Sequence, residues 1–131
     1  PGKANVLRDG GDVCVIAAGL MIPEALKAAE LLEKDGVSAA VVNMHTIKPI
    51  DSEIILTMAG KCGAIVTAEE HSIIGGLGSA VAEVLAGRSA AKFARVGIQD
   101  KFGQSGKPAD LFKAYGLTAE NIAETCRMIL K

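Results

Sequence analysis

The chain has 131 residues, of which half are apolar, and a formal net charge of -1. This length suits one domain that buries roughly 70% of the surface of the unfolded chain. The nearly balanced charge gives no reason to expect nucleic acid or an anionic membrane as a partner. No run of eighteen apolar residues and no signal peptide is recognisable, so we expect no membrane span. Because the sequence begins at Pro1 without Met, we expect a piece of a longer protein.

The cysteines do not suggest chemistry. Cys14, Cys62 and Cys126 are odd in number, widely separated and set in apolar surroundings. We therefore expect free thiols that fill the core of a cytoplasmic protein, and no disulfide framework. With His45 and His71 as the two histidines and no Cys-x-x-Cys motif, a metal site is not expected.

Apolar strands alternate with amphipathic helices along the chain, which is typical of an α/β fold with a mainly parallel sheet. We interpret residues 1–11 as a linker or edge segment and residues 12–131 as the domain. The predicted order is strand 13–18, helix 20–34, strand 37–44, helix 51–59, strand 63–68, helix 79–86, strand 94–98, helix 108–115 and helix 118–130. Asp51 and Thr118 are the predicted N-caps of two of these helices.

The candidate site follows the strand predicted at 63–68. Two carboxylates and an imidazole are expected to leave the sheet at its carboxyl end, where α/β proteins gather ligands and partners. Glycines then allow a close approach of the backbone before helix 79–86, whose positive end points at the loop. Such a turn suits an anion or contact with another subunit. The candidate residues are Glu69, Glu70, His71, Gly75, Gly76 and Gly78.

Other motifs fail on their spacing. Residues 76–81 lack the third glycine of the dinucleotide fingerprint, and Gly106-Lys107-Pro108 does not match the Walker pattern. Glu69, Glu70 and His71 form a possible acid–base set, but consecutive strand residues face opposite ways. We therefore favour the interpretation that they bind backbone amides and a neighbouring chain.

Several segments occur in an order that is more specific than any one motif. They are 19–25 (GLMIPEA), 43–51 (NMHTIKPID), 69–78 (EEHSIIGGLG), 102–106 (FGQSG) and 115–122 (YGLTAENI). Together they resemble the C-terminal domain of transketolase, especially the split, two-subunit kind. The resemblance covers about residues 12–131.

The resemblance implies a three-layer α/β/α domain. Its five-stranded, mostly parallel sheet would have one antiparallel edge strand, at either residues 4–7 or 13–18. In this family, thiamine diphosphate and a divalent metal lie between pyrimidine- and diphosphate-binding domains, which belong to the same chain or to a separate subunit. The complete enzyme, a homodimer or heterotetramer, passes a two-carbon ketol unit between sugar phosphates in the pentose phosphate pathway.

The same resemblance implies that this domain serves assembly and dimerisation. We therefore assign it no catalytic residue and no residue that binds cofactor or metal, and we expect it to be inactive alone. Deoxyxylulose phosphate synthase and the beta chain of 2-oxo-acid dehydrogenases share the domain and are alternatives. A different class is a stand-alone regulatory or interaction module that binds an anion. Tight binding of phosphates, nucleotides or thiamine diphosphate to the isolated chain in calorimetry would favour that module.

The predicted interface at His71 is testable. In a complete enzyme, His71→Ala should weaken assembly or ketol transfer, because the imidazole would lose its contact with a partner domain. Sedimentation and turnover measurements check this expectation. If the strength of the dimer and the turnover both stay unchanged, the assignment of His71 is rejected.

Overall fold

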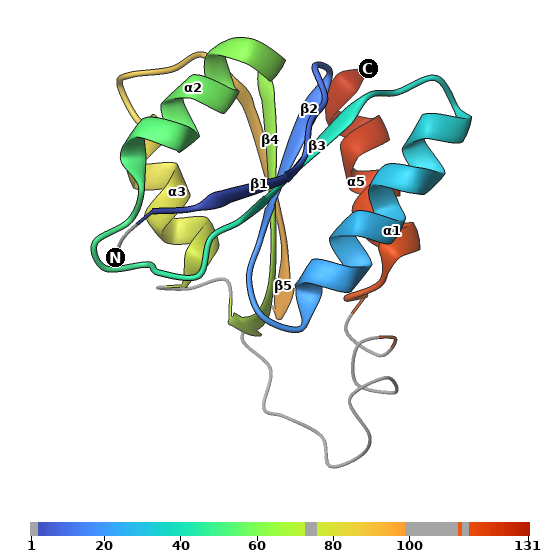
Figure 1. Ribbon diagram of the computed structural model, residues 1–131, viewed down its shortest axis with the longest axis horizontal. Coiled ribbons are helices and arrows are strands. Elements are labelled where there is room, and N and C mark those ends of the chain that lie inside the picture. The colour runs from blue at the N-terminus through green and yellow to red at the C-terminus, as the bar shows by residue number, and fades with distance from the viewer. Residues whose placement is uncertain (1–2, 73–75, 99–112, 114–115) are drawn as a thin grey trace.

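The computed structural model describes residues 3–72, 76–98, 113 and 116–131. One five-stranded sheet, in the order β1-β3-β2-β4-β5, separates two layers of helices (Figure 1). The strands are β1 (Asn5–Arg8), β2 (Val13–Ala17), β3 (Ala39–Asn43), β4 (Ala64–Ser72) and β5 (Lys92–Ile98). The helices are α1 (Met21–Lys34), α2 (Ser52–Cys62), α3 (Leu77–Leu85) and α5 (Ala119–Leu130). The predicted three-layer α/β/α fold is confirmed.

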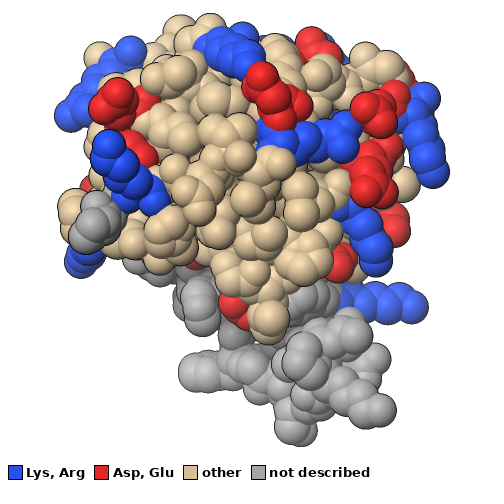
Figure 2. All heavy atoms as spheres, viewed as in Figure 1, with Lys and Arg blue, Asp and Glu red and all other residues tan. Residues whose placement is uncertain are grey.

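The antiparallel edge strand is β1. It pairs antiparallel with β3, whereas β2, β3, β4 and β5 are joined by parallel pairs. Residues 13–17, the other candidate for this role, instead form a central strand with every residue buried. The view of Figure 2 looks onto the β1 edge, where charged side chains lie mainly around the rim and the middle is largely uncharged.

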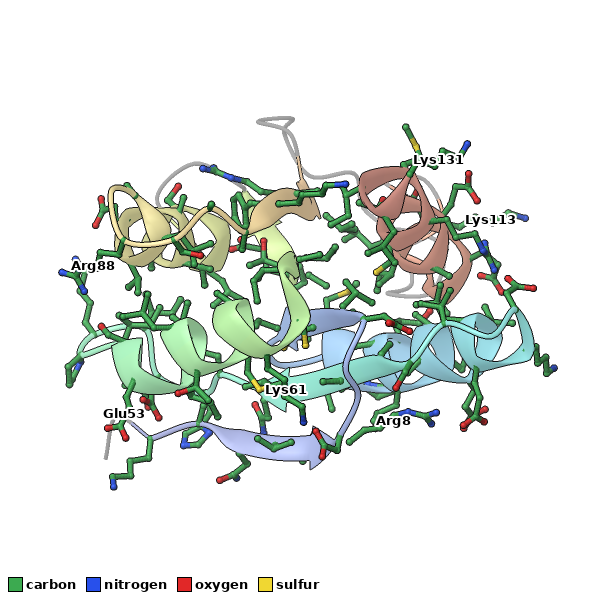
Figure 3. All side chains as sticks on the ribbon, turned by 90° about the horizontal axis from the view of Figure 1, so that it is seen from above. Arg8, Glu53, Lys61, Arg88, Lys113 and Lys131 are labelled. Carbon is green, nitrogen blue, oxygen red and sulfur yellow. The ribbon has the colours of Figure 1, made fainter. Side chains whose placement is uncertain are left out.

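Two separate apolar cores lie on the two faces of the sheet, because side chains alternate along each strand. Val13, Val15 and Ala17 of β2 pack under α1 and α5, and Cys14 and Ile16 pack under α2 and α3. Figure 3 shows side chains filling the space between the sheet and the helices on both sides, with the labelled Glu53, Arg88, Lys113 and Lys131 toward the outside. The chain thus covers both faces of its sheet with its own helices and is expected to fold alone.

The structure corrects the predicted ends of two elements. We expected Glu69, Glu70 and His71 to leave the sheet, but β4 continues through them to Ser72, which pairs with Ile98. Their polar character suggested a loop, whereas the strand continues through them, with the Glu69 and Glu70 side chains on opposite faces. Helix α2 is longer than predicted and ends at Gly63, whose φ of 69° gives the left-handed stop. The connection after the strand predicted at 94–98 and the helix predicted at 108–115 fall largely outside the described residues.

Asp51 ties the N-terminal segment to the start of α2. Its Oδ1 accepts a hydrogen bond from the Ile54 N–H at 3.2 Å, which confirms the predicted N-cap. Its Oδ2 accepts a second one from the Ala4 N–H at 2.9 Å, 47 residues away. The bond from Ala4 is the main reason why the pKa of Asp51 lies below its ordinary value. This carboxylate therefore holds the chain that leads into β1.

Asp51→Ala should lower the free energy of unfolding at pH 7 by about 1 to 2 kcal/mol, because the helix loses its cap and Ala4 its acceptor. Since the pKa is lowered on folding, the stabilisation is complete above an ordinary aspartate pKa of about 4 and is lost as the pH falls through the lowered value. Urea unfolding at several pH values measures this. Glu53→Gln, on the exposed side of the same helix turn, is the matched control. An equal loss in both variants would contradict the role of Asp51.

Candidate functional site

The buried carboxylate of Glu69 caps α3 from the neighbouring strand. The Glu69 side chain is 3% exposed. Its Oε1 accepts the Leu77 N–H at 2.8 Å and its Oε2 accepts the Gly78 N–H at 2.7 Å. Residue Gly76, at the N-cap position, offers no side chain for this purpose. A helix start exposes unpaired N–H groups and positive partial charge, so a carboxylate with two bonds is well matched to it.

Glu70 lies on the opposite face of β4 and contacts the start of α1. Its Oε1 accepts the Leu20 N–H at 3.3 Å. Gly19, just before, has a φ of 58°, and a Cβ there would lie 2.5 Å from the same carboxylate oxygen. The positive φ favours glycine at this position, whereas the carboxylate oxygen belongs to the end of a flexible side chain that can shift.

A third carboxylate lies at the start of α5. Glu24, in the first turn of α1, accepts the Ala119 N–H at 3.0 Å. The hydroxyl of Thr118 accepts the Asn121 N–H at 3.1 Å, which confirms the predicted cap. Helices α1, α3 and α5 all begin near the carboxyl ends of the strands, at the lower edge of Figure 1.

An α/β protein usually binds its ligand at this carboxyl edge of the sheet. Here backbone N–H groups at three helix starts already donate to glutamates of the same chain. An external anion at α3 would have to displace the Glu69 carboxylate, and it would meet a negative charge there. Within residues 3–72, 76–98, 113 and 116–131, no three His, Cys, Asp or Glu side chains are grouped to hold a metal ion. Among the described side chains, Glu69 and Glu70 position two different backbone segments and do not face a common point.

The glycines of the candidate site have different roles. Gly78 allows α3 to approach the sheet, because a Cβ there would lie 3.1 Å from Thr67 Oγ1 and 3.0 Å from Arg95 Cδ. Gly76 is extended, with a φ of -96°, a conformation that any residue can adopt. Gly75 lies outside the described residues, as does the side chain of His71, although the backbone of His71 belongs to β4.

The structure therefore brings Glu69 together with the start of α3 and sends Glu70 to α1. Sequence reasoning did not find Glu24 as a member of this set. Its partner Ala119 is 95 residues away, and an acidic residue in the first turn of a helix is common for its own sake. His45 is exposed.

The cysteines are free, as expected. Burial raises the pKa of Cys126 to about 12 and also raises that of Cys14. The half-buried Cys62 has a raised pKa for the same reason, and its Sγ donates to the Gly10 carbonyl at 3.5 Å. Protonated thiols are poor nucleophiles and poor metal ligands, so all three cysteines are structural.

None of the described helices combines the length and the apolar character that crossing a bilayer requires.

The family model described as "Transketolase, C-terminal domain" matches residues 2–122. The chain belongs to this family. The recognition made from its motifs is confirmed.

Curated relatives carry two kinds of name. The 6-deoxy-6-sulfo-D-fructose transketolase subunit SqwH of Clostridium sp. (strain MSTE9) is 48% identical over 98% of this chain and 40% of its own length. A putative transketolase C-terminal section of Methanocaldococcus jannaschii is 52% identical over 94% of this chain and 38% of its own length. The 1-deoxy-D-xylulose-5-phosphate synthase of Heliobacterium modesticaldum is 44% identical over 96% of this chain and 20% of its own length. This transketolase C-terminal domain therefore spans two fifths or less of these relatives.

Solved structures show the same fold. A split-gene transketolase, described as an inactive β4 tetramer, superposes with a TM-score of 0.94 at 48% identity, covering 99% of this chain and 43% of that one. The transketolase of Leishmania mexicana superposes with a TM-score of 0.74 at 22% identity, covering 98% of this chain and 18% of that one. At this identity the match shows the fold alone.

The family depends on thiamine diphosphate and a divalent metal in the complete enzyme. The described residues of this domain do not suit the diphosphate, because the α3 amides that would bind it already bind Glu69. The start of α1 also faces a carboxylate of β4, because the Leu20 N–H donates to Glu70. We therefore derive no step of the reaction from this domain.

Glu69→Gln should destabilise the fold by about 1.5 to 3 kcal/mol, because the new amide NH2 would face one of two buried helix N–H groups. Glu70→Gln is the matched control on the next residue. It should cost less than about 1 kcal/mol, because its one bond is long and exposed. Urea unfolding of both variants gives the comparison. A Glu69→Gln protein as stable as Glu70→Gln would contradict the proposed cap.

Proposed function

We propose that this chain is the assembly domain of a thiamine diphosphate-dependent transketolase, and that ketol transfer takes place on the other domains. The observation that supports this best is the Glu69 carboxylate on the two amides of α3. The Leu77 and Gly78 N–H groups, which could otherwise bind an anion, are thereby bonded within the domain itself. An edge fixed in this way is suited to contacts with protein surfaces.

The choice of transketolase over its sister enzymes rests on the relatives. Two of them with transketolase in their names are 48% and 52% identical, whereas the 1-deoxy-D-xylulose-5-phosphate synthases are 40% to 44% identical. We propose sugar phosphates as substrates, in the pentose phosphate pathway. A sulfonated ketose, as in the name of the Clostridium relative, is a second donor to assay.

The remaining three fifths of the related split chains have no counterpart in these 131 residues. We propose that pyrimidine- and diphosphate-binding domains, in the same chain or in another subunit, complete the enzyme in the cytoplasm. The related split-gene chain is described as a β4 tetramer without activity. This supports self-association of the present chain as a step separate from catalysis.

Reconstitution tests this proposal. The 131-residue chain alone should show no ketol transfer and no saturable binding of thiamine diphosphate with Mg²⁺. Co-expression with the pyrimidine- and diphosphate-binding domains from the same genome should give transfer from a ketose phosphate to an aldose phosphate, and omission of this chain should abolish it. Turnover by the chain alone, or tight cofactor binding, would contradict the proposal. Formation of 1-deoxy-D-xylulose 5-phosphate in its place would reassign the enzyme to the synthase.

A further inference from the structure

Strand β1 covers one edge of the sheet without entering either core. Val6 is 49% and Leu7 43% exposed, and among the described residues those of β1 belong to neither apolar core. The strand has four residues, and its register against β3 shifts between Val6 and Arg8. Lifting β1 from the sheet would therefore leave both cores whole, and it would cost mainly backbone hydrogen bonds.

The strand that β1 covers is buried on both of its faces. Residues 39–42 of β3 are all buried, and they alternate between the core under α1 and α5 and the core under α2 and α3. If this edge were bare, unpaired N–H and C=O groups would lie beside apolar side chains. Such an edge is a template for the addition of further strands and for aggregation. The position of β1 is therefore protective.

Two exposed ion pairs hold the end of β1. Arg8 donates to Glu33 of α1 at 2.9 Å, and Lys61 of α2 pairs with Asp9 just after the strand. Figure 3 shows the labelled Arg8 and Lys61 near this end of β1. The side chains of Glu33 and Asp9 are 71% and 75% exposed. Water and salt therefore weaken both pairs, and each contributes little to the stability of the strand.

The turn that follows β1 is attached more closely. Gly10 lies on the backbone at the start of β3, since a Cβ there would lie 2.6 Å from the Ala40 nitrogen. The Asp12 N–H donates to the Ser38 carbonyl at 2.8 Å, and the Ser38 N–H donates to the Asp12 carboxylate at 2.7 Å. Residues 10–12 thus remain bound to the start of β3 when β1 is lifted, and they can act as a hinge.

We propose that residues 3–9, called the β1 strap below, open as a unit about this hinge while the rest of the domain stays folded. The closed strap keeps β3 from taking up another strand. Besides its pairing with β3 and the two ion pairs, the strap is held by the bond from Ala4 to Asp51 and by the partly buried Ala4 side chain. Few buried contacts and exposed bonds are the conditions under which a segment opens locally.

Amide hydrogen exchange of the 131-residue chain, followed by mass spectrometry and corrected for intrinsic rates, tests the opening. The strap should exchange at least about tenfold faster than the central strand β2. Arg8→Gln with Asp9→Asn removes both ion pairs without changing the net charge. This double variant should speed exchange of the strap about three- to thirtyfold and leave β2 unchanged. In the wild type, NaCl at about 1 M should act in the same direction.

The same double variant tests the protection of β3. Because its strap is open more often, the lag before thioflavin T fluorescence rises should be shorter than in the wild type. The matched control is Glu124→Gln with Arg127→Gln, which breaks exposed ion pairs of α5 and also keeps the net charge. It should change neither the exchange of the strap nor the lag. Circular dichroism should show the native fold in every variant.

Three results would overturn the inference. A wild-type strap that exchanges as slowly as β2, or a strap and β2 that speed up together in the double variant, would show that β1 opens only with the whole domain. Faster exchange of the strap with an unchanged lag would remove its protective role. An equally shortened lag in the α5 control would assign the effect to lost ion pairs in general. Ketol transfer by the reconstituted enzyme is measured separately, so the proposed function does not depend on these results.

Discussion

The arrangement of this domain depends on one buried carboxylate. Glu69 takes both N–H groups at the start of α3, and its own burial is tolerable because both of its oxygens are bonded to that positive helix end. The same bonds fix the distance between β4 and α3. Gly78 then leaves little room for a larger residue, because a Cβ there would lie 3.0 Å from Arg95 Cδ and 3.1 Å from Thr67 Oγ1.

Two further glutamates accept backbone N–H groups at the starts of α1 and α5. Glu70 binds the backbone before α1, and Glu24 of α1 binds the first residue of α5. The carboxyl edge of the sheet is therefore cross-linked by the side chains of the chain itself, which joins both helix layers to β4. Such an edge keeps its shape without a ligand, which suits the assembly role proposed above. The function proposed above accordingly assigns ketol transfer to the other domains of the complete protein.

The sequence predicts those features of the fold whose causes are local. Apolar runs and helical spacing gave the order of strands and helices, and the caps Asp51 and Thr118 bind N–H groups only three residues ahead. The predicted end of β4 was wrong, because the polar Glu69 and Glu70 suggested a loop. Glu69 binds amides eight and nine residues ahead, and Glu70 binds one 50 residues away, so the interpretation that they bind backbone amides holds although the strand end was misplaced. The bond from Ala119 to Glu24 spans 95 residues, so no spacing rule reaches it. The edge strand stayed open between two segments, because pairing direction depends on the whole sheet.

Amide hydrogen exchange at Leu77 and Gly78 tests the central claim most directly. If Glu69 holds these two N–H groups, they should exchange as slowly in the isolated chain as the amides of the central strand β2, and inorganic phosphate or thiamine diphosphate should leave them unchanged. Fast exchange in the free chain, slowed when either anion is added, would show a helix start that waits for a ligand and would contradict the account.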